Sequence, residues 1–498
     1  RYWQAKTAVR LAASFLASWV LEAPAADVPV WPQFRGPNGS GVAAPEANPP
    51  TRFGPNDNVI WKVSVPSGHS SPCIWGDSLF LTGFDEQERK LKTFCLDRTS
   101  GALRWCRDVS AGQFEQVHSI SSPATATPAT DGERVYVYFG SCGLLSYNFD
   151  GELLWSVPLP VPQVRFGSGT SPVVLGDSVI LNRDEQKESH VIAVNRKDGT
   201  IRWRHTQAPS SPFGASSYST PVVWRGHLVF HRMDEIAACS AEDGTPVWSV
   251  RVATNGESTP VVGDDTLLVA AWNHFGDAES RVKLPDFRTL LKQHDDNGDG
   301  KISKAEFPED LVVARRAEVG DLPGSVVLVK PFWQMIDKDR DSLIDEQEWQ
   351  GATALALSLY REHGLMAIQS GGRGDITATH VLWQVKTDIP EVPSPLYYNS
   401  RLYMVRNGGI VSCIDAKSGV LLYCQAIGAP GPYYTSPVAG QGRIYVASWK
   451  GIVTVLAAGE MPVILAKNDL GEPMLATPAI VEANLYVRTA KHMYAFGN

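Results

Sequence analysis

A serine-proline or threonine-proline step that leads into apolar residues recurs eight times along the chain. The steps are Ser71-Pro72, Thr127-Pro128, Ser171-Pro172, Thr220-Pro221, Thr259-Pro260, Ser394-Pro395, Ser436-Pro437 and Thr477-Pro478. The successive prolines lie 56, 44, 49, 39, 135, 42 and 41 residues apart, so six of the seven spacings are close to one repeat length. Self-similarity at a fixed period of this size is typical of repeat architectures.

The repeat that begins at Ser436 shows the internal pattern clearly. Pro437 opens one apolar stretch, and residues 443–446, 452–456 and 463–465 form three more, with turn signals between them. Proline suits the first residue of a strand, where no ladder donor is lost. Four short strands per repeat predict an all-β fold, an eight-bladed β-propeller of four-stranded antiparallel blades. A solenoid or a sandwich fits less well, because eight uniform antiparallel units suit radial closure.

Several repeats also carry a turn glycine followed four residues later by tryptophan, as in Gly101 with Trp105 and Gly199 with Trp203. We expect each of these rings to fill a seam between neighbouring blades. The last repeat stops after a third strand, residues 492–496, whereas residues 58–63 look like an orphan fourth strand with its own tryptophan. Residues 58–63 are therefore predicted to complete blade eight and remove the open sheet edges.

The 135-residue spacing predicts an insertion in the fifth repeat, and residues 295–306 within it fit a twelve-residue calcium loop. Gly300 occupies the sharp turn, and Ile302 is the apolar residue that would pair this loop with a second one. The predicted ligands are Asp295, Asn297, Asp299, the carbonyl of Lys301 and bidentate Glu306, with Ser303 acting through water.

A second loop follows 42 residues later, and Ser342 stands at its turn in place of glycine, which predicts strain and a weaker site. Its predicted ligands are Asp337, Asp339, Asp341, the carbonyl of Leu343, Asp345 and Glu348. Apolar residues at helical spacing precede both loops, and residues 352–360 continue helically, so the two loops resemble paired EF-hands. Solvated acidic turns are the alternative interpretation. Residues 286–350 hold 15 acidic and nine Lys or Arg residues, so most of the chain's net charge of −8 lies here.

The predicted insertion covers residues 276–370, between propeller segments 27–275 and 371–498. We expect Trp272 to end the second strand of blade five, residues 281–284 to be its third strand, and residues 380–386 to be its fourth. This places the insertion between the third and fourth strands.

Residues 1–26 have the layout of a secretory signal, because a basic start precedes a short apolar run and small residues. A buried N-terminal helix is the alternative. No other segment is long and apolar enough to span a membrane. The signal predicts a periplasmic or secreted protein, and in such a compartment the pairs Cys95/Cys106 and Cys413/Cys424, each 11 residues apart, suggest two local disulfides. Buried free thiols are the alternative.

The repeats, together with Trp-Pro-Gln-Phe-Arg-Gly-Pro-Asn at residues 31–38, resemble the pyrroloquinoline-quinone-like β-propeller repeat family. This family includes quinoprotein dehydrogenases and non-catalytic outer-membrane assembly factors. The resemblance implies the fold, but one scaffold hosts many functions. The dehydrogenases hold the quinone between a tryptophan and a disulfide of adjacent cysteines, beside calcium and a catalytic aspartate. This chain has no adjacent cysteines, and Asp184, with Asn182 and Arg183, is the nearest aspartate candidate.

The leading hypothesis is a calcium-binding, non-catalytic propeller that binds a protein or polymer partner on its face, with no assigned catalytic residue. A quinone-dependent dehydrogenase acting on an alcohol or sugar is the second hypothesis, and a regulatory calcium sensor is the third. The acidic balance excludes binding to nucleic acid through a basic surface. Polar residues in the loops at the propeller mouth are candidate ligand contacts: His118, Arg165, Asn182, Arg183, Asp184, His231, Trp272, Asn273, Trp449 and Lys491.

Overall fold

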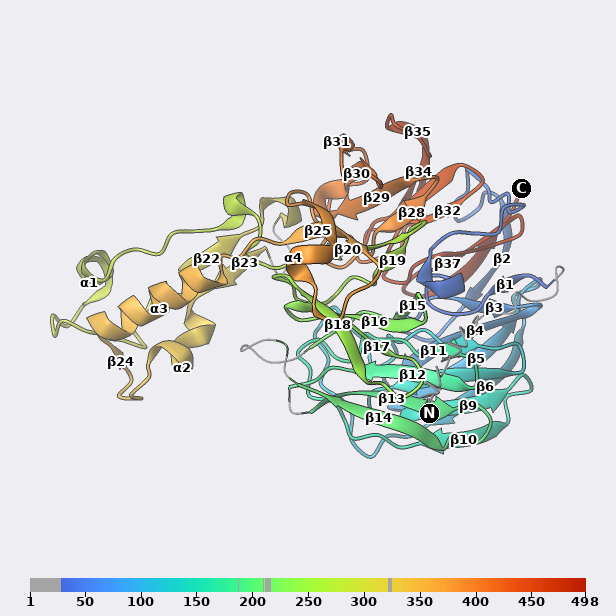
Figure 1. The fold of residues 1–498 in the computed structure, drawn as a ribbon, viewed down its shortest axis with the longest axis horizontal. Helices are drawn as coiled ribbons and strands as arrows, with labels where there is room; N and C mark the ends of the chain where they lie inside the picture. The colour runs from blue at the N-terminus through green and yellow to red at the C-terminus, as the bar shows by residue number, and fades with distance from the viewer. Residues whose placement is uncertain (1–27, 187, 209, 211–215, 321–324) are drawn as a thin grey trace, which may run out of the picture.

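The computed structural model describes residues 28–498, apart from residues 187, 209, 211–215 and 321–324. The predicted secretory signal, residues 1–26, lies outside the described residues. Eight antiparallel sheets surround a central axis, and a partly helical insertion projects from one side of them (Figure 1). The predicted eight-bladed β-propeller is therefore confirmed.

Blades one to four follow one another along the chain, and each runs from its innermost to its outermost strand. In blade one, β1 (Val30–Trp31) also pairs with the inner strand, and in blade four β26 (Gly374–Asp375) pairs parallel to the outer strand. The strands are β3 (Cys73–Trp75), β4 (Ser78–Asp85), β5 (Lys90–Asp97) and β6 (Leu103–Val109); β7 (Ala129–Thr130), β8 (Arg134–Phe139), β9 (Gly143–Asn148) and β10 (Leu153–Val157); β11 (Val173–Leu175), β12 (Ser178–Arg183), β13 (Ser189–Asn195) and β14 (Ile201–Gln207); and β15 (Val222–Trp224), β16 (His227–Arg232), β17 (Glu235–Ser240) and β18 (Pro246–Arg251).

Blades five to eight continue this order, except that the outer strand of blade eight comes from the start of the chain. The strands are β19 (Val261–Val262), β20 (Thr266–Ala271), β25 (Gly364–Gln369) and β27 (Val381–Val385); β28 (Leu396–Tyr398), β29 (Arg401–Arg406), β30 (Ile410–Asp415) and β31 (Leu421–Ala426); β32 (Val438–Gly440), β33 (Arg443–Ala447), β34 (Ile452–Ala457) and β35 (Val463–Asp469); and β36 (Ala479–Val481), β37 (Asn484–Arg488), β38 (His492–Phe496) and β2 (Val59–Ser64).

The eight Ser/Thr-Pro steps form a closed ring of hydrogen bonds. The amide N–H of each serine or threonine donates to the hydroxyl oxygen of its counterpart in the next blade, at 2.9–3.2 Å. The series starts with Ser71 donating to Thr127 and ends with Thr477 donating back to Ser71. We call these eight residues the hydroxyl ring. The hydroxyl ring closes after eight hydrogen bonds, so it gives a count of eight blades that does not depend on the assignment of the sheets.

The tryptophans fill the seams between blades, as the sequence predicts. Trp105 is buried, its indole N–H donates to the carbonyl of Phe149 in blade two at 2.7 Å, and its ring lies against Gly151. A Cβ at Gly151 would lie 2.6 Å from that ring, so the turn has to be glycine. Trp61 packs against blade one in the same way, and its indole N–H donates to the carbonyl of Arg98 at 2.9 Å.

Strand β2 closes the propeller. It pairs antiparallel with β38, and Trp61 lies opposite Ala495. The prediction that residues 58–63 complete blade eight is therefore confirmed. The two ends of the propeller are joined in one sheet, in which β2 is the outer strand and pairs with β38.

The insertion lies between the second and third strands of blade five, not between the third and fourth. Strand β20 pairs with β25, which in turn pairs with β27, so the third strand is Gly364–Gln369 rather than residues 281–284. Residues 272–363 therefore form the insertion, and β25 lies within the predicted range 276–370. In an up-and-down blade, the loop after the second strand is on the same face as the loop that enters the first. The insertion thus stands at the propeller mouth.

Short elements make up the insertion, and β22 and β23 lie between its helices and the propeller (Figure 1). Its elements are η2 (Ala278–Ser280), α1 (Phe287–His294), β21 (Ile302–Ser303), β22 (Val312–Arg315), η3 (Ala317–Val319), β23 (Val326–Leu328), η4 (Lys330–Phe332), α2 (Trp333–Ile336), β24 (Leu343–Ile344) and α3 (Glu346–Leu359). The remaining short helices belong to the propeller: η1 (Pro37–Gly39), α4 (Thr377–His380) and η5 (Asn407–Gly409).

The two predicted disulfides are absent, because all seven cysteines have free thiols. A β-bulge in each hairpin shifts the strand pairing by one residue. Cys95 therefore lies opposite Trp105, and Cys106 opposite Phe94, so the two thiols point to opposite faces of the sheet. The register is the same in blade six, where Cys413 lies opposite Tyr423.

We accordingly expect all seven thiols to react when the protein is denatured in iodoacetamide without a reductant. Mass spectrometry of the intact chain measures the number of adducts. Prior reduction should leave that number unchanged. An increase of two or four adducts after reduction would show that one or both of the hairpin pairs are bridged.

Candidate functional site

The insertion is held together by an aromatic core that sets two loops side by side. Phe307 packs edge-on against Trp333 and Trp349, with ring centroids 5.5 and 6.0 Å apart. Ile302 pairs with Ile344 in a short two-stranded sheet, so the predicted pairing of the loops through Ile302 is confirmed. Helix α1 precedes the first loop, and α2 and α3 flank the second, whereas residues 304–311 form no second helix after the first loop.

In the first loop, the predicted ligands Asp295 and Glu306 accept hydrogen bonds from backbone amides of the loop. The carboxylate of Asp295 accepts hydrogen bonds from the amides of Gly298 and Gly300, at 2.8 and 3.0 Å. The carboxylate of Glu306 accepts from the amides of Asp296 and Asn297, at 3.2 and 3.3 Å. Asp295 and Glu306, at the two ends of the loop, therefore approach each other across it.

The second loop repeats this network at equivalent positions. Asp337 accepts from the amide of Ser342 at 3.2 Å, and Glu348 accepts from the amide of Lys338 at 2.8 Å. Carboxylate oxygens of Asp337, Asp339 and Asp341 all lie within 4.8 Å of one another. Three like charges this close are unfavourable unless a cation neutralises them.

Two details of the second loop bear on how well it could hold a cation. Asp337 is only 6% exposed, and its Oδ1 atom has no hydrogen-bond partner among the described residues, while Trp333 donates to Oδ2 at 3.1 Å. Ser342 has a φ of 69°, close to the 80° of Gly300 in the first loop. The predicted strain at Ser342 is therefore present, because a side chain occupies a conformation that favours glycine.

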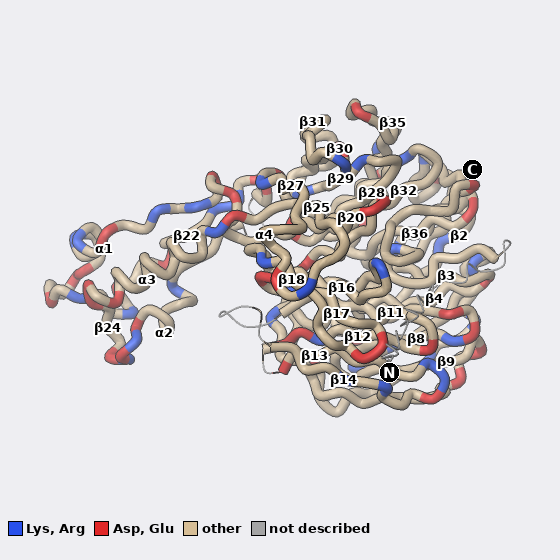
Figure 2. Tube along the Cα trace, in the orientation of Figure 1, with Lys and Arg blue, Asp and Glu red and all other residues tan. Residues whose placement is uncertain are grey.

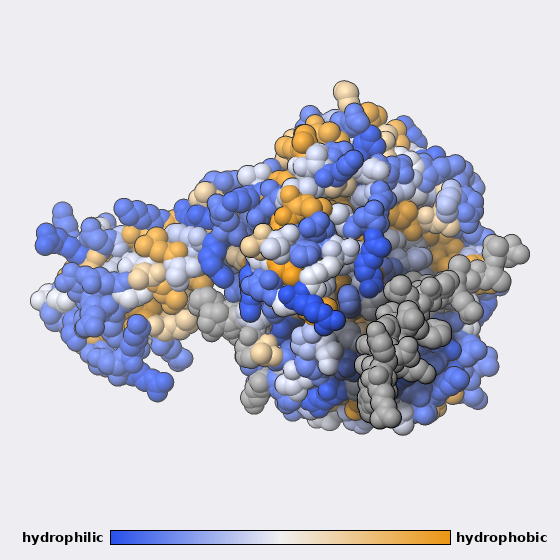
Figure 3. Space-filling view, viewed as in Figure 1, coloured by the Kyte–Doolittle hydropathy of each residue, from blue (hydrophilic) through white to orange (hydrophobic). Residues whose placement is uncertain are grey.

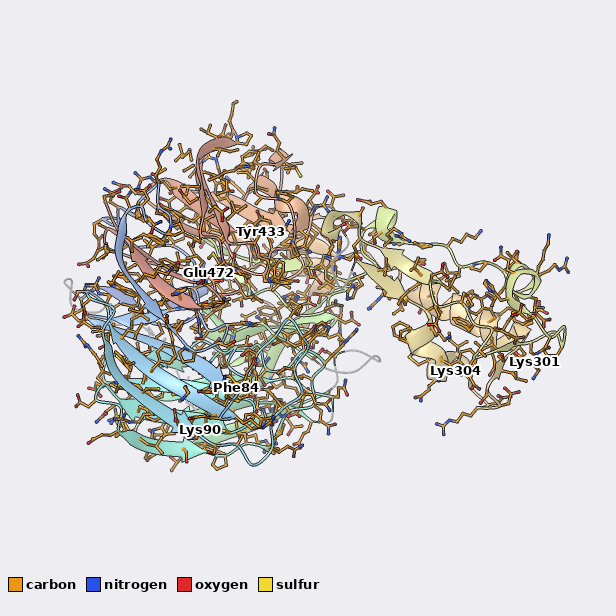
Figure 4. The ribbon with its side chains drawn as sticks, turned by 180° about the vertical axis from the view of Figure 1, so that it is seen from behind. Phe84, Lys90, Lys301, Lys304, Tyr433 and Glu472 are labelled. Atoms are coloured by element: carbon orange, nitrogen blue, oxygen red, sulfur yellow. The ribbon has the colours of Figure 1, made fainter. Side chains whose placement is uncertain are left out.

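Acidic residues gather along the chain at the end of the insertion farthest from the propeller (Figure 2). Lys301 and Lys304 mark this end in Figure 4. The ammonium group of Lys301 lies 3.0 Å from Asp341, so it links the two loops. Leu343, whose carbonyl is a predicted ligand, donates its amide to Asp341 at 2.8 Å.

A second candidate site is a cavity of about 960 Å³ lined by both the insertion and the propeller mouth. Seven of the eight hydroxyl-ring residues line it. The residue two positions before each hydroxyl-ring residue lines the cavity as well. We call these eight residues the mouth layer: His69, Thr125, Gly169, Tyr218, Glu257, Val392, Tyr434 and Leu475. In extended chain, residues two apart face the same way, so the mouth layer and the hydroxyl ring both face the axis.

An arginine of the insertion is anchored in the cavity wall. Arg316 pairs with Glu391 through two bonds of 3.0 and 2.7 Å, and its guanidinium lies 4.8 Å from the ring of Trp272. Asn407 donates to the same carboxylate at 3.1 Å. Arg316 lowers the pKa of Glu391, although burial opposes this effect. The insertion is thereby fixed to the propeller at the mouth.

Glu257, the only acidic member of the mouth layer, lacks such a partner. Its Oε2 atom is buried and unpaired in the described part of the chain. Burial, and then the nearby charge of Glu391, raise its pKa well above the usual value. In the lining of the same cavity, burial lowers the pKa of His274 to about 4, so that this imidazole is neutral at pH 7.

The raised pKa of Glu257 predicts a pH-dependent loss of stability. Above about pH 4.3, the usual pKa of glutamate, the folded protein binds more protons at this site than the unfolded chain does. The free energy of unfolding should therefore fall as pH rises toward the folded-state pKa, by about 1.4 kcal/mol per pH unit. Denaturant unfolding of the wild type and of Glu257→Gln at several pH values tests this, since the variant should lose that slope. Parallel pH profiles for the two proteins would contradict the prediction.

The structure brings only part of the predicted mouth residues to the cavity. His118 and Arg165 line it, and both lie against Phe166. Trp272 lies behind Arg316, and Lys491 is exposed. Asn182 is buried, and its side-chain amide has no hydrogen-bond partner among the described residues. His231 is fully buried and hydrogen-bonded through both ring nitrogens, and Asp184 is paired with Arg232 at 3.1 Å. Asp184 is therefore not free to act as a catalytic base.

Sequence reasoning missed Glu257, His274, Arg316 and Glu391. A signal for Glu257 exists, because it stands two residues before Thr259, at the position that faces the axis in every repeat. Glu391 lies in the equivalent loop, three residues before Ser394. No periodic signal marks Arg316 or His274, since both lie in the insertion.

Known proteins share this fold. A family profile described as outer membrane protein assembly factor BamB matches residues 51–233 and 187–284. The chain is a PQQ-like β-propeller. The assembly factor BamB of Yersinia pestis is 25% identical to this propeller over 247 residues, which are 43% of this chain and 56% of that relative. The match thus spans little more than half of the relative's length.

Solved structures agree on the fold of this PQQ-like propeller. BamB from Moraxella catarrhalis superposes with a TM-score of 0.53 at 12% identity, covering 88% of this chain and 98% of that one. A europium-containing methanol dehydrogenase gives 0.58 at 9% identity, covering 94% and 98%. The quinohemoprotein alcohol dehydrogenase of Comamonas testosteroni gives 0.54 at 10% identity, covering 94% and 80%. In the described residues, none of the helices has the length and apolarity needed to cross a bilayer.

Proposed function

We propose that this protein is a periplasmic or secreted, non-catalytic propeller that binds a protein or polymer partner at its mouth, and that its insertion holds two calcium ions. The observation that carries this proposal is the cavity between the insertion and the mouth layer, in which Arg316 ties the two parts together. The similarity to the assembly factor BamB supports a binding role. The function of such a site is to present a shaped surface to a partner.

The residues of both loops fit calcium. Each loop offers carboxylate, amide and backbone oxygens, the ligands that this hard cation prefers. The unpaired Oδ1 of Asp337 and the convergence of Asp337, Asp339 and Asp341 support an ion in the second loop. The ligands of the first ion would be Asp295, Asn297, Asp299, Lys301 and Glu306. Those of the second would be Asp337, Asp339, Asp341, Leu343 and Glu348.

We further infer that calcium serves a structural purpose. Asp337 directly follows α2, whose residues Met335 and Ile336 line the cavity. An ion at Asp337 would therefore fix the position of one cavity wall. Extracellular modules bind calcium with dissociation constants of about 0.1–1 mM, which is sufficient for permanent loading outside cells.

The mouth does not fit pyrroloquinoline quinone, although quinoprotein dehydrogenases share the fold. The quinone carries three carboxylates, whereas Glu257 and Glu391 line the cavity, and Arg316 is already paired with Glu391. The face of Trp272 is covered by that same guanidinium, and no tryptophan is among the described residues that line the cavity. The seven cysteines include no adjacent pair that could form the family's disulfide.

Calorimetric titration of the metal-free protein with calcium tests the proposal. We expect two ions per chain, and no heat on adding the quinone afterwards. Tight quinone binding, with oxidation of an alcohol or sugar in the presence of an electron acceptor, would instead establish the dehydrogenase. Micromolar calcium affinity would favour a regulatory sensor over a permanently loaded module.

A further inference from the structure

One member of the mouth layer is acidic, and the other seven carry no carboxylate. Glu257 is the exception, and it lies beneath the insertion beside Glu391. Two aromatic members of the same layer line the cavity with these acids. Burial, and then the charge of Glu257, raise the pKa of Tyr218 to about 12, whereas burial and the charge of Glu391 raise the pKa of Tyr434. The mouth layer therefore holds one carboxylate, that of Glu257, with the aromatic side chain of Tyr218 close to it.

The two arginines of the described lining are both engaged by groups other than Glu257. Arg316 serves both Glu391 and Glu318, at 2.7 and 3.3 Å, and among the described residues it forms no hydrogen bond with the unpaired Oε2 of Glu257. Arg165 is the other arginine of the described lining, but it is exposed at the rim and stacks on Phe166. An added cation would pair with Glu257 and reduce its repulsion from Glu391. Tyrosine faces also attract ammonium and guanidinium groups.

The opposite wall of the cavity is apolar and comes from the insertion. Leu328, Phe332 and Met335 line it and are 36, 41 and 50% exposed. Leu355 and Leu359, on the facing side of α3, extend the same surface. Figure 3 shows apolar residues on the insertion between its polar end and the propeller. Side chains of this type gain by contact with an apolar ligand, since each buried methylene contributes about 0.8 kcal/mol.

We propose that the cavity binds a polypeptide segment in which a lysine or arginine is flanked by apolar residues. The basic side chain reaches Glu257 beside Tyr218 of the neighbouring blade four. The flanking apolar residues lie against Phe332, Met335 and Leu355 of the insertion. This inference rests on the proposed function, because it specifies the chemistry of the partner that the mouth binds.

Binding of fluorescein-labelled, end-capped heptapeptides to the full chain in calcium tests it. One peptide carries a single lysine between leucine and valine residues, and its match carries glutamate in place of that lysine. Fluorescence anisotropy should show the lysine peptide binding at least about tenfold more tightly, as expected for loss of a desolvated charge pair. The variant Glu257→Gln should reduce the preference to about twofold or less, whereas Glu242→Gln, at the opposite end of blade four, should retain it.

A third variant tests the apolar wall of the cavity separately from Glu257. It also distinguishes failure of the cationic assignment from failure of the proposed function. Met335→Asp should weaken binding of both peptides, and unchanged thermal unfolding midpoints show that each variant is folded. If the glutamate peptide binds as tightly as the lysine peptide, and Met335→Asp weakens both, the cationic assignment is wrong but the mouth still binds polypeptide. If neither peptide binds, the proposed polypeptide partner is overturned as well. A lysine preference that survives in Glu257→Gln would overturn the role of Glu257.

Discussion

Replacing Glu348 with glutamine is expected to lower the calcium affinity of the second loop by about 100-fold. Glu348 is the last of the proposed ligands of its loop, and its carboxylate accepts hydrogen bonds from the amides of Lys338 and Asp345, at 2.8 and 3.2 Å. Glutamine offers one oxygen and no charge, so it cannot act as a bidentate anionic ligand. Calorimetry should then show one ion binding as in the wild type and the other binding much more weakly.

The control for this change is Glu346→Gln, two residues earlier on the same helix. Glu346 bonds only to Gln350 among the described residues and faces away from the loop. It should leave both affinities unchanged. If Glu348→Gln binds two calcium ions with wild-type affinity, the assignment of the second loop is wrong.

Replacing Trp61 with alanine is expected to destabilise the folded propeller by about 3–5 kcal/mol. Trp61 is 7% exposed, donates to the carbonyl of Arg98 and lies against Gly101 of blade one. It also belongs to β2, the strand that joins the two ends of the propeller. Its removal therefore leaves a cavity at the seam where closure is achieved. Guanidinium unfolding followed by circular dichroism measures the loss.

Ile60→Ala, on the same strand, is the matched control. Ile60 is 49% exposed, and we expect a loss of less than about 1 kcal/mol. Equal losses at Ile60 and Trp61 would contradict the closing role assigned to Trp61.

The blade count was predictable because one short step serves the same purpose in every repeat. Each Ser/Thr-Pro step supplies a hydroxyl to the ring and starts an inner strand, so its spacing reveals the repeat directly. The two candidate calcium loops follow from a similar pattern, since their proposed oxygen ligands stand at set distances along the chain. The tryptophan seams followed from the glycine turns on which the rings lie.

Other features depend on contacts between segments that are distant in sequence. The strand signal of residues 281–284 is no weaker than that of β25, and only the pairing of β25 with β20 decides which belongs to blade five. The disulfide prediction failed because a one-residue bulge reverses the face on which a side chain lies. The ion pair of Arg316 with Glu391 joins residues 75 apart in the sequence, and no local sequence pattern predicts it.

An anomalous-scattering map from crystals grown with calcium tests the central claim most directly, namely that a calcium-binding module is mounted at the mouth of a closed eight-bladed ring. We expect two peaks, one coordinated by Asp295, Asp299 and Glu306 and one by Asp337, Asp339, Asp341 and Glu348, in a chain whose hydroxyl ring is complete. Crystals with calcium in solution but no anomalous peak in either loop would contradict it.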